Sequence, residues 1–373
     1  MVRLSEIVTT AADAGVSILD DGDRLHMPAG RNGPWDDDVT PLRNTGHWAV
    51  LFFEAYAVTG DERYRTAAAD CIDYLCRDEA RPEGCAFHHR NEPGKDRCNG
   101  LVGQGWTIEA LAVADRYLDD ERPRSLAEEV FLLHPFDEST GLWRSVGVDG
   151  TVRRPFGTIN QQFWFAAAGS LLCRRGDAPE VRRRIVSFLD DVEDTVETYR
   201  SGVVYHSGYP YSTPRYVGQR LAAQVTGHHE RIDPRSVGYH SFVLYALAVL
   251  KRSLPDHPLW TSGFVDHLLE PLGSERYREQ VADNEFSYGY NPTGIENALA
   301  LEVLGDGEDV GYWLSEQFGG WYDPQSGLLR GGADDVTLAA RLYEATRLGG
   351  RAVPPSTADR VEEAVAPGGE TGR

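Results

Sequence analysis

Apolar and polar positions along the chain follow a pattern that repeats about six times. Each repeat contains a helix-length segment that is apolar on nearly all sides. These segments cover residues 48–58, 106–113, 163–173, 242–250, 295–304 and 336–343. A helix that is apolar on all sides must be buried on all sides. The pattern therefore predicts six helices that form the inside of the molecule.

The helices between these segments are predicted to be apolar on one face only. Apolar residues recur there at helical spacing, first as Tyr64, Ala68, Cys71, Ile72 and Leu75 and later as Val181, Ile185, Phe188, Leu189, Val192 and Val196. Buried helices that alternate with one-faced helices indicate an inner ring wrapped by an outer ring. We therefore expect an all-α protein with the fold of an (α/α)6 toroid.

The sixth inner helix has no downstream partner, because the chain continues into Pro354, Pro355 and a tail rich in Gly and Glu. We expect an N-terminal helix over 4–19 to pack beside it and close the ring. The sequence thus predicts one toroid over residues 1–350 and a flexible tail over 351–373. Loops at 77–97, 135–158 and 199–238 mix turn residues with aromatic residues, so short β-hairpins are expected at one mouth of the ring.

The chain is strongly acidic, with 58 acidic and 37 basic residues and a net charge of −21, and its only lysines are Lys95 and Lys251. This composition suits a cytoplasm of molar salt, where charges are screened within about 3 Å. A halophilic archaeal source is therefore favoured, and a mildly acidic protein of a high-GC mesophile is the alternative. The charge argues against nucleic acid and anionic lipid as partners, since both need a basic face.

Targeting signals are not recognisable, because the N-terminus lacks a charged segment followed by an apolar run. We expect a cytoplasmic protein whose five cysteines are reduced. Cys85 and Cys98 with His88 and His89 could be imagined as a zinc site, but their spacing matches no standard ligand pattern. We therefore expect neither a metal nor another cofactor.

Function is expected in the loops at one mouth of the toroid, where the starts of the inner helices line a central funnel. Aromatic faces stack on sugar C–H groups, and amides and carboxylates bind vicinal hydroxyls. The residues predicted to bind a sugar are His47, Trp48, His88, His89, Arg90, Gln104, Trp106, Asn160, Gln161, Gln162, Tyr205, Tyr209, Tyr211, Tyr239, Tyr288, Tyr290, Asn291 and Asp334.

Many of these residues also have a structural interpretation. Trp48 and Trp106 lie at equivalent helix positions and could be core residues. Asn160 could be a helix cap, and Asp334 would be favourable at a helix start without any ligand. The acidic run at 36–38 is expected to be a solvated face rather than a catalytic cluster. The histidines differ, because five of the eleven fall at the proposed mouth and imidazole moves protons near neutral pH.

Three stretches of the chain resemble a known family, namely NGLVGQGWTIEAL (99–111), INQQFWFAAAG (159–169) and YHSFVLYALAVLK (239–251). They are similar to the AglQ family of haloarchaeal N-glycosylation proteins and, more distantly, to the six-hairpin glycosidases. The close resemblance covers roughly residues 41–350. It implies an (α/α)6 toroid in the cytoplasm with a part in assembling the lipid-linked glycan of the S-layer glycoprotein. The implied step concerns a hexuronic-acid residue.

One position of this chain differs from the pattern of the distantly similar glycosidases. Unsaturated glucuronyl hydrolases share the toroid and place an essential Asp at the start of the third inner helix. The corresponding position here carries Asn160, whose amide cannot accept the proton that their mechanism requires. This argues against hydration of an unsaturated uronide.

Two enzymatic hypotheses follow. A glycoside hydrolase needs a protonated carboxylic acid and a second carboxylate, about 5–5.5 Å apart for retention or 6.5–9.5 Å for inversion. The candidates are Asp96, Glu285, Glu296 and Asp334. An epimerase or isomerase needs two proton-transfer groups on opposite faces of one carbon. Toroidal sugar 2-epimerases use histidines in this way, and the resemblance implies His206 and His240 for this role.

The expected ligand is a saccharide or a lipid-linked oligosaccharide, and membrane contact is expected only through that substrate. A uronate carboxylate would need a cation, for which Arg90, Arg97 and Arg215 are the candidates. A third hypothesis gives the protein no catalytic role. The protein would then hold a glycan for a glycosyltransferase of the same pathway. Such a glycosyltransferase is the protein partner that we expect.

Overall fold

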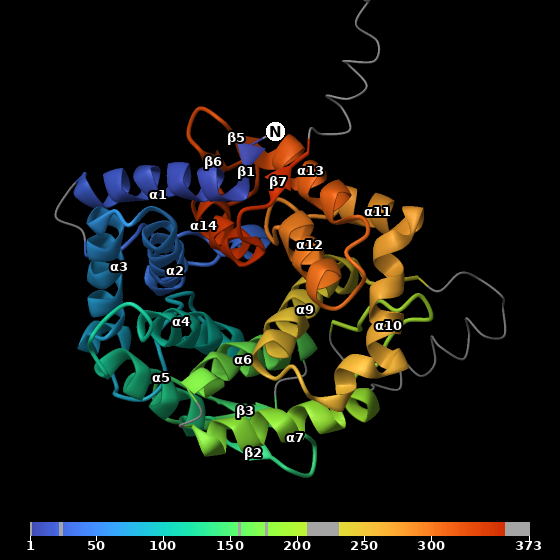
Figure 1. Cartoon of the computed structure of the whole chain (residues 1–373). Helices are drawn as coiled ribbons and strands as arrows, with labels where there is room; N and C mark the ends of the chain where they lie inside the picture. Colours follow the sequence, from blue (N-terminus) through green and yellow to red (C-terminus); the bar gives the residue numbers. More distant parts are fainter. Residues whose placement is uncertain (1, 22–24, 156–157, 176–177, 207–230, 355–373) are drawn as a thin grey trace, which may run out of the picture.

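The computed structural model describes residues 2–21, 25–155, 158–175, 178–206 and 231–354, and its helices form two concentric rings (Figure 1). The inner ring consists of α2 (Leu42–Thr59), α4 (Gly100–Ala114), α6 (Ile159–Ser170), α9 (Pro234–Ser253), α12 (Thr293–Val303) and α14 (Asp335–Ala340). The outer ring consists of α1 (Leu4–Asp20), α3 (Glu62–Leu75), α5 (Arg122–Leu133), α7 (Pro179–Thr195), α10 (Gly263–Leu269), α11 (Glu275–Ala282) and α13 (Val310–Trp321). This is the (α/α)6 toroid that the sequence predicts.

The two kinds of helix differ in burial as their sequences require. All residues of α4 except Val113 are buried, whereas α3 buries only the stripe that includes Tyr64, Cys71 and Leu75. Consecutive inner helices contact one another, and the segment after α14 contacts both α12 and α2, so the ring is closed. None of the described helices has the length and apolar character that crossing a membrane requires.

Local signals set the helix ends. Helix α2 stops at Gly60, whose φ of 72° is readily adopted by glycine, and Asp61 then caps α3 by accepting a hydrogen bond from the Arg63 amide at 2.9 Å. Helix α9 begins in the same way. The Asp233 side chain accepts from the Arg235 amide at 2.8 Å, and Pro234 occupies the first helical position. The Asp233 cap fixes where the inner helix α9 begins, and the candidate site lies at that end of the inner helices.

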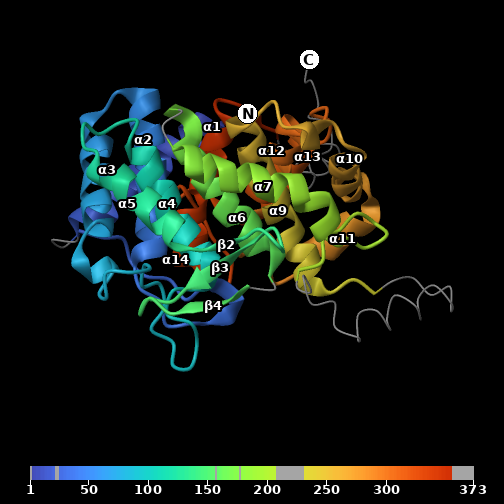
Figure 2. The same cartoon turned by 90° about the horizontal axis from the view of Figure 1, so that it is seen from below.

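Short antiparallel strands lie in the loops. Strands β2 (Phe136–Asp137), β3 (Leu142–Val146) and β4 (Val152–Pro155) form one sheet, and Figure 2 shows it beyond the ends of the inner helices. Strands β5 (Tyr322–Asp323) and β6 (Leu328–Leu329) form a hairpin. The β2–β3 turn DESTGL and the β5–β6 turn DPQSGL share one mechanism: Asp137 and Asp323 accept from the amide two residues on, and Gly141 and Gly327 have positive φ. The predicted hairpins are present in the loop at 135–158. The loop at 77–97 has no strand pairing beyond an isolated bridge between Val39 and Arg90, and the described part of the loop at 199–238 has none beyond a bridge between Thr198 and Val204.

The C-terminal segment departs from the prediction of a tail that starts at residue 351. Strand β7 (Ala352–Val353) pairs with β1 (Val2–Arg3) at the edge of the ring, and the Leu4 amide donates to the Arg351 carbonyl at 2.8 Å. Helix α1, which follows β1, packs on α2 and on the segment after α14. The remainder of the predicted tail, 355–373, lies outside the described residues.

The sixth inner helix also differs from the helix expected over 336–343. Helix α14 ends at Ala340, and the chain continues as a 3₁₀ helix over Arg341–Leu348. A 3₁₀ helix has 3.0 residues per turn, so residues three apart lie on one face. Arg341, Glu344 and Arg347 have this spacing, and all three side chains are directed into buried ion pairs.

We expect Gly15→Ala to destabilise the contact between α1 and α2. A Cβ at Gly15 would lie 2.4 Å from Cζ3 of Trp48 and 2.8 Å from Cε1 of Phe52. Overpacking against rigid rings costs about 1–3 kcal/mol, which exceeds the helix-propensity gain of about 1 kcal/mol. The matched control is Gly320→Ala in α13, where nothing lies within 4 Å of the new Cβ. Thermal unfolding should show a lower Tm for the first variant only, and equal Tm values would contradict the packing described.

Candidate functional site

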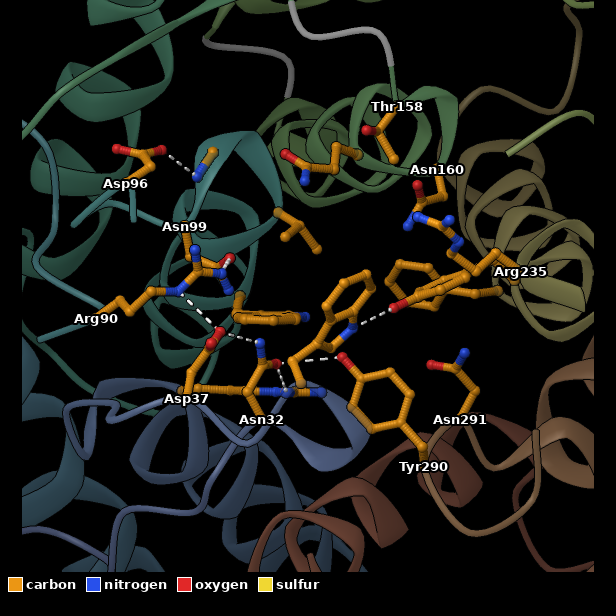
Figure 3. Close-up of a pocket in the computed structure, with 18 of the residues that line it drawn as sticks. Asn32, Asp37, Arg90, Asp96, Asn99, Thr158, Asn160, Arg235, Tyr290 and Asn291 are labelled. Carbon is orange, nitrogen blue, oxygen red and sulfur yellow. Dashed lines mark hydrogen bonds and ion pairs between the residues drawn. The ribbon is translucent and has the colours of Figure 1, made fainter. Parts of the chain in front are cut away.

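A cavity of about 300 Å³ lies at the end of the ring where the inner helices begin (Figure 3). Its walls come from α2, α4, α6 and α9, from the loops that precede these helices and α12, and from the 3₁₀ helix after α14. Asn32, Asp37, Arg90 and Asn99 gather on one side of it, and Asn160 and Arg235 lie on the other. The predicted position of the site is therefore where the structure has its cavity.

Asp37 lies at the centre of an ion-pair cluster on this wall. It is 2% exposed, its Oδ2 lies 3.0 Å from Nε of Arg90, and its Oδ1 pairs with Lys95. Asn32 donates from Nδ2 to the same carboxylate at 2.9 Å. The expectation of a solvated acidic face at 36–38 is wrong for Asp37, because the ring brings cations from a distant loop to cover it.

Arg43 of α2 is a buried cation without a carboxylate partner among the described residues. It is 6% exposed, donates from Nη1 to Oδ1 of Asn32 at 3.0 Å, and stacks 3.9 Å above the Trp106 ring. Its Nε lies 3.4 Å from Nε2 of His47, and its Nη2 is buried without a hydrogen-bond partner. Burial lowers the pKa of this guanidinium. Its direct partners carry no negative charge, and Asp334, whose charge favours the charged guanidinium, makes no ion pair with it.

Arg341 lies at the floor of the cavity and is fully paired. Its guanidinium donates to Oε1 of Glu296 at 2.8 Å and to Oε1 of Glu344 at 2.7 Å. Burial, followed by the charge of Glu344, raises the pKa of Glu296 to about 8. Glu296 does not itself line the cavity, so this carboxyl acts on the site through Arg341.

His206 lines the cavity beside Tyr239 of α9. The two rings are stacked with their centroids 4.5 Å apart, and Nδ1 of His206 has no hydrogen-bond partner. Burial lowers the pKa of His206 to about 4, so the imidazole is neutral near pH 7 and can accept a proton. Burial raises the pKa of Tyr239 well above its usual value, which keeps the phenol protonated.

Other predicted residues also line the cavity. Asn160 stands in the first turn of α6, and its Oδ1 is buried without a partner, whereas Thr158 is the cap. Asp96 lies 2.9 Å from Arg153 and accepts from the Gly100 amide at 2.8 Å. The remaining predicted residues that line the cavity are Arg90, Trp106, Gln161, Tyr239, Tyr290 and Asn291.

Four of the histidines predicted at the mouth do not line this cavity. His240 faces the outer ring: its Nδ1 accepts from the Val204 amide at 3.3 Å, and its Nε2 lies 3.0 Å from the Leu268 carbonyl. Both ring nitrogens are thus occupied by backbone. His47 lies flat on Tyr343. His88 and His89 lie in the loop before α4.

Two of the three predicted glutamines, Gln104 and Gln162, bind backbone groups instead of lining the cavity. Gln104 accepts from the Phe87 amide at 2.8 Å and donates to the Phe87 carbonyl at 3.0 Å. Gln162 binds both backbone groups of Trp143 at 2.9 Å. Each side chain therefore ties the first turn of an inner helix to the loop before it.

Asp334 likewise acts on the backbone. Its carboxylate accepts from the amides of Arg31 at 2.7 Å, Gly33 at 3.1 Å and Thr337 at 3.1 Å. Burial by itself raises the pKa of Asp334, but these hydrogen bonds outweigh burial and leave it lowered. Asp334 therefore caps α14 and holds the loop that precedes α2.

The remaining predicted residues lie elsewhere. Trp48 packs in the core against Phe52, and Tyr205 stacks on Tyr199. Tyr288 is buried away from the cavity, Glu285 is exposed, and Arg97 pairs with Glu83 at 2.8 Å. Tyr209, Tyr211 and Arg215 lie outside the described residues. Among the described residues, no group of three His, Cys, Asp or Glu side chains is placed to hold a metal ion.

Several residues that line the cavity are not among the site residues predicted from sequence, namely Asn32, Trp35, Asp37, Arg43, Lys95, Asn99, Gly100, Val102, Thr158, Arg235, Phe242 and Arg341. Most are cations or their partners. Five cations (Arg43, Arg90, Lys95, Arg235 and Arg341) and two carboxylates (Asp37 and Asp96) line the cavity of a chain whose net charge is −21. The rarity of lysine in the sequence could have pointed to this cavity, because Lys95, one of only two lysines in the chain, lines it.

No protein-family model matches the chain. A curated protein, Archaeal glycosylation protein Q of Haloferax volcanii, is 43% identical over 367 residues, which cover 93% of this chain and 98% of that protein. Solved structures of the same fold include D-mannose isomerase, at 13% identity over 92% of this chain and 97% of that one, with a TM-score of 0.63. Cellobiose 2-epimerase from Spirochaeta thermophila has 14% identity over 92% and 94%, with a TM-score of 0.61. Unsaturated glucuronyl hydrolase from Bacillus sp. GL1 has 14% identity over 91% and 94%, with a TM-score of 0.57.

These solved structures share the fold alone, since so little of their sequence is shared. The protein is thus an (α/α)6 toroid of the class that also contains sugar isomerases, sugar epimerases and glycoside hydrolases. The curated relative carries the assignment further, because the identity extends over nearly the whole of both chains. The chain belongs to the family of Archaeal glycosylation protein Q.

The burial of His240 leads to a prediction of how the free energy of unfolding depends on pH. Burial lowers its pKa to about 4, whereas an unfolded histidine titrates near about 6.5. Between these values the unfolded chain binds a proton that the folded chain does not. Stability is therefore fully present above pH ~6.5 and falls as the pH drops toward 4. In urea unfolding at pH 7.5 and pH 5, His240→Gln should show a smaller loss of free energy of unfolding than the wild type. Equal losses would contradict this assignment.

Proposed function

We propose that this protein acts in archaeal N-glycosylation, on a hexuronic-acid residue of the lipid-linked glycan destined for the S-layer glycoprotein, and that it works in the cytoplasm. The observation that carries the proposal is Arg43, a buried cation that borders a cavity with an excess of positive charge. The family relationship to Archaeal glycosylation protein Q supports the pathway.

The energetics of Arg43 favour an anionic ligand. A buried charge without a partner of opposite charge is costly, and proteins normally pair such groups. A uronate carboxylate would provide the missing partner through a charge-assisted hydrogen bond from the guanidinium. Nη2 of Arg43 has a hydrogen to donate, and the Trp106 ring below holds the guanidinium plane. A neutral sugar would leave the charge uncompensated.

The reaction we propose is proton transfer at the carbon that bears the carboxylate. His206 removes the proton from this carbon, and the electron pair that remains is delocalised into the carboxylate, whose added charge Arg43 stabilises. A proton returned to the opposite face of the same carbon completes an epimerisation, and no atom is gained or lost. Tyr239 and Tyr290 are the candidates to return it, since both line the cavity.

Hydrolysis is less well supported. It requires one carboxylic acid that carries a proton near neutral pH. The two carboxylates that line the cavity are bound to cations, Asp37 to Arg90 and Lys95, and Asp96 to Arg153. Both carboxylates are therefore already engaged in ion pairs. The carboxyl with a pKa raised to about 8 is Glu296, which lies beneath Arg341 rather than in the cavity.

Replacing Arg43 tests the ligand class. Arg43→Met should weaken binding of D-glucuronate, D-galacturonate or D-mannuronate by about tenfold or more, since it removes the charge that faces the carboxylate. The folded state should be as stable as the wild type or more so, because an unpaired buried charge is lost. Calorimetric titration and thermal unfolding measure the two effects.

The matched control for this test is Arg278→Met. Arg278 stacks 4.0 Å over the Tyr312 ring and pairs with Asp309, remote from the cavity. Uronate binding should survive this change. Uronate affinity that is unchanged in Arg43→Met would reject the proposed ligand class.

Isotope incorporation tests the reaction. Lipid-linked glycan from Haloferax volcanii cells that lack the 43% identical relative is incubated with the protein in D₂O. Proton transfer should place one deuterium on carbon, which adds one mass unit per uronate. His206→Gln should abolish the incorporation and leave uronate affinity within about twofold, because a neutral side chain replaces a neutral imidazole.

The other outcomes separate the alternatives. A glycan that loses one sugar, with ¹⁸O from labelled water in the product, would replace epimerisation by hydrolysis. Binding without any change of mass would favour a component that holds the glycan for a glycosyltransferase.

A further inference from the structure

The turn before α2 is held in an unusual conformation. It is a 3₁₀ turn over Gly33–Trp35, and the residues on either side are left-handed without being glycine, Asn32 with φ of 61° and Asp36 with φ of 48°. Such conformations are uncommon for residues with a side chain and persist only where the surroundings fix them. They concentrate at sites that clamp a ligand.

The surroundings of this turn do fix it. The Asn32 side chain donates to Asp37 and accepts from Nη1 of Arg43 at 3.0 Å and from the Tyr290 hydroxyl at 3.2 Å, and Figure 3 shows Tyr290 directed toward Asn32. Gly33 packs on the Tyr290 ring so closely that a Cβ would lie 2.1 Å from its Cδ2. Asp334 holds the Gly33 amide from the other side. The turn is therefore a rigid part of the site.

This turn presents an indole at the mouth of the cavity. Trp35 lines the cavity and is 38% exposed, whereas the other seven tryptophans of the chain are buried or partly buried. Its Nε1 donates to the Tyr239 hydroxyl at 3.1 Å, and its ring lies 5.8 Å from that of Phe286. An indole fixed by its polar edge and left partly exposed has apolar area available to a ligand.

We propose that Trp35 forms a second sugar subsite outside the cavity. The sugar next to the uronate would stack on the indole, so the substrate is the end of an oligosaccharide and not a free monosaccharide. This inference rests on the proposed function, which places the uronate inside. A cavity of about 300 Å³ is at the small end of ligand pockets, and a longer glycan must continue past its rim.

Arg235 gives the outer subsite a polar partner. It lies one turn before Tyr239 on α9, so the two side chains share a face of that helix. It lines the cavity, and among the described residues it pairs only weakly with a carboxylate, that of Asp233 at 3.8 Å. An exposed indole together with a guanidinium suits a hydroxylated or acidic ring, which needs an apolar face and a donor.

The test compares uronate monosaccharides with disaccharides that contain the same uronate, called monomers and dimers here, by calorimetric titration. The pairs are D-glucuronate with cellobiouronate, D-galacturonate with digalacturonate, and D-mannuronate with dimannuronate. For the uronate that binds, the dimer should bind about tenfold more tightly than the monomer. Trp35→Leu should remove this gain, so that this variant binds the dimer no more tightly than the monomer. Trp35→Phe should retain most of the gain, because it keeps an aromatic face.

Two controls accompany these variants. Trp35→Phe loses the hydrogen bond to Tyr239, so it separates stacking from the positioning of that phenol. Val58→Ala changes another exposed apolar side chain, at the far end of α2, and should alter neither affinity. Thermal unfolding confirms that each variant is folded.

The outcomes are distinct. A dimer that gains nothing in all three pairs, or a gain that survives Trp35→Leu, overturns the outer subsite. Equal losses in Trp35→Leu and Trp35→Phe also overturn it, because the effect then comes through Tyr239. Binding of a monomer that depends on Arg43, without any dimer gain, leaves the proposed function standing. No binding of any uronate would reject both.

Discussion

The closed ring depends on charged side chains that meet at its centre. Arg341 pairs with Glu296 of α12 and with Glu344, while Arg347 pairs with Glu109 of α4. Removing one partner of such a buried pair typically costs about 3–5 kcal/mol, because the other charge is left without compensation. The last inner segment therefore contacts its neighbours through electrostatics as well as through apolar packing. The 3₁₀ geometry over Arg341–Leu348 is what places these charges on one face.

The same ring centre sets the electrostatics of the cavity. Arg341 forms its floor and is neutralised by the carboxylates below it, whereas Arg43 beside it has only uncharged partners. Among the described residues, Arg43 is thus a buried cation whose direct partners are all uncharged, in a chain of net charge −21. A buried charge without a paired carboxylate lowers the free energy of unfolding. We expect a protein to keep such a charge where a bound ligand supplies the opposite charge. The acidic exterior and the cationic cavity together favour binding of an anionic ligand inside the cavity over its binding to the outer surface.

The candidate site shows where sequence reasoning succeeds and where it fails. The starts of the inner helices were predicted to line the funnel, and Trp106, Asn160 and Tyr239 do line the cavity. Gln104 is likewise a polar residue near the start of an inner helix, yet its side-chain amide hydrogen-bonds the backbone of the preceding loop. A polar residue at a helix start can face the cavity or the loop, and one helical position, about 100°, separates the two. The residue type alone does not show in which of these two directions the side chain points.

The sequence by itself determined the fold, because burial leaves a periodic record in the chain. A helix such as α4 that is buried on every side has no polar face, and α3 beside it has one apolar stripe. Only the tertiary structure decided which charges are paired. Asp37 and Lys95 are separated by 58 residues, and their ion pair exists only because two loops meet at one mouth of the ring. Electrostatic energy depends on distances in space, and distances between remote segments are fixed when the ring closes.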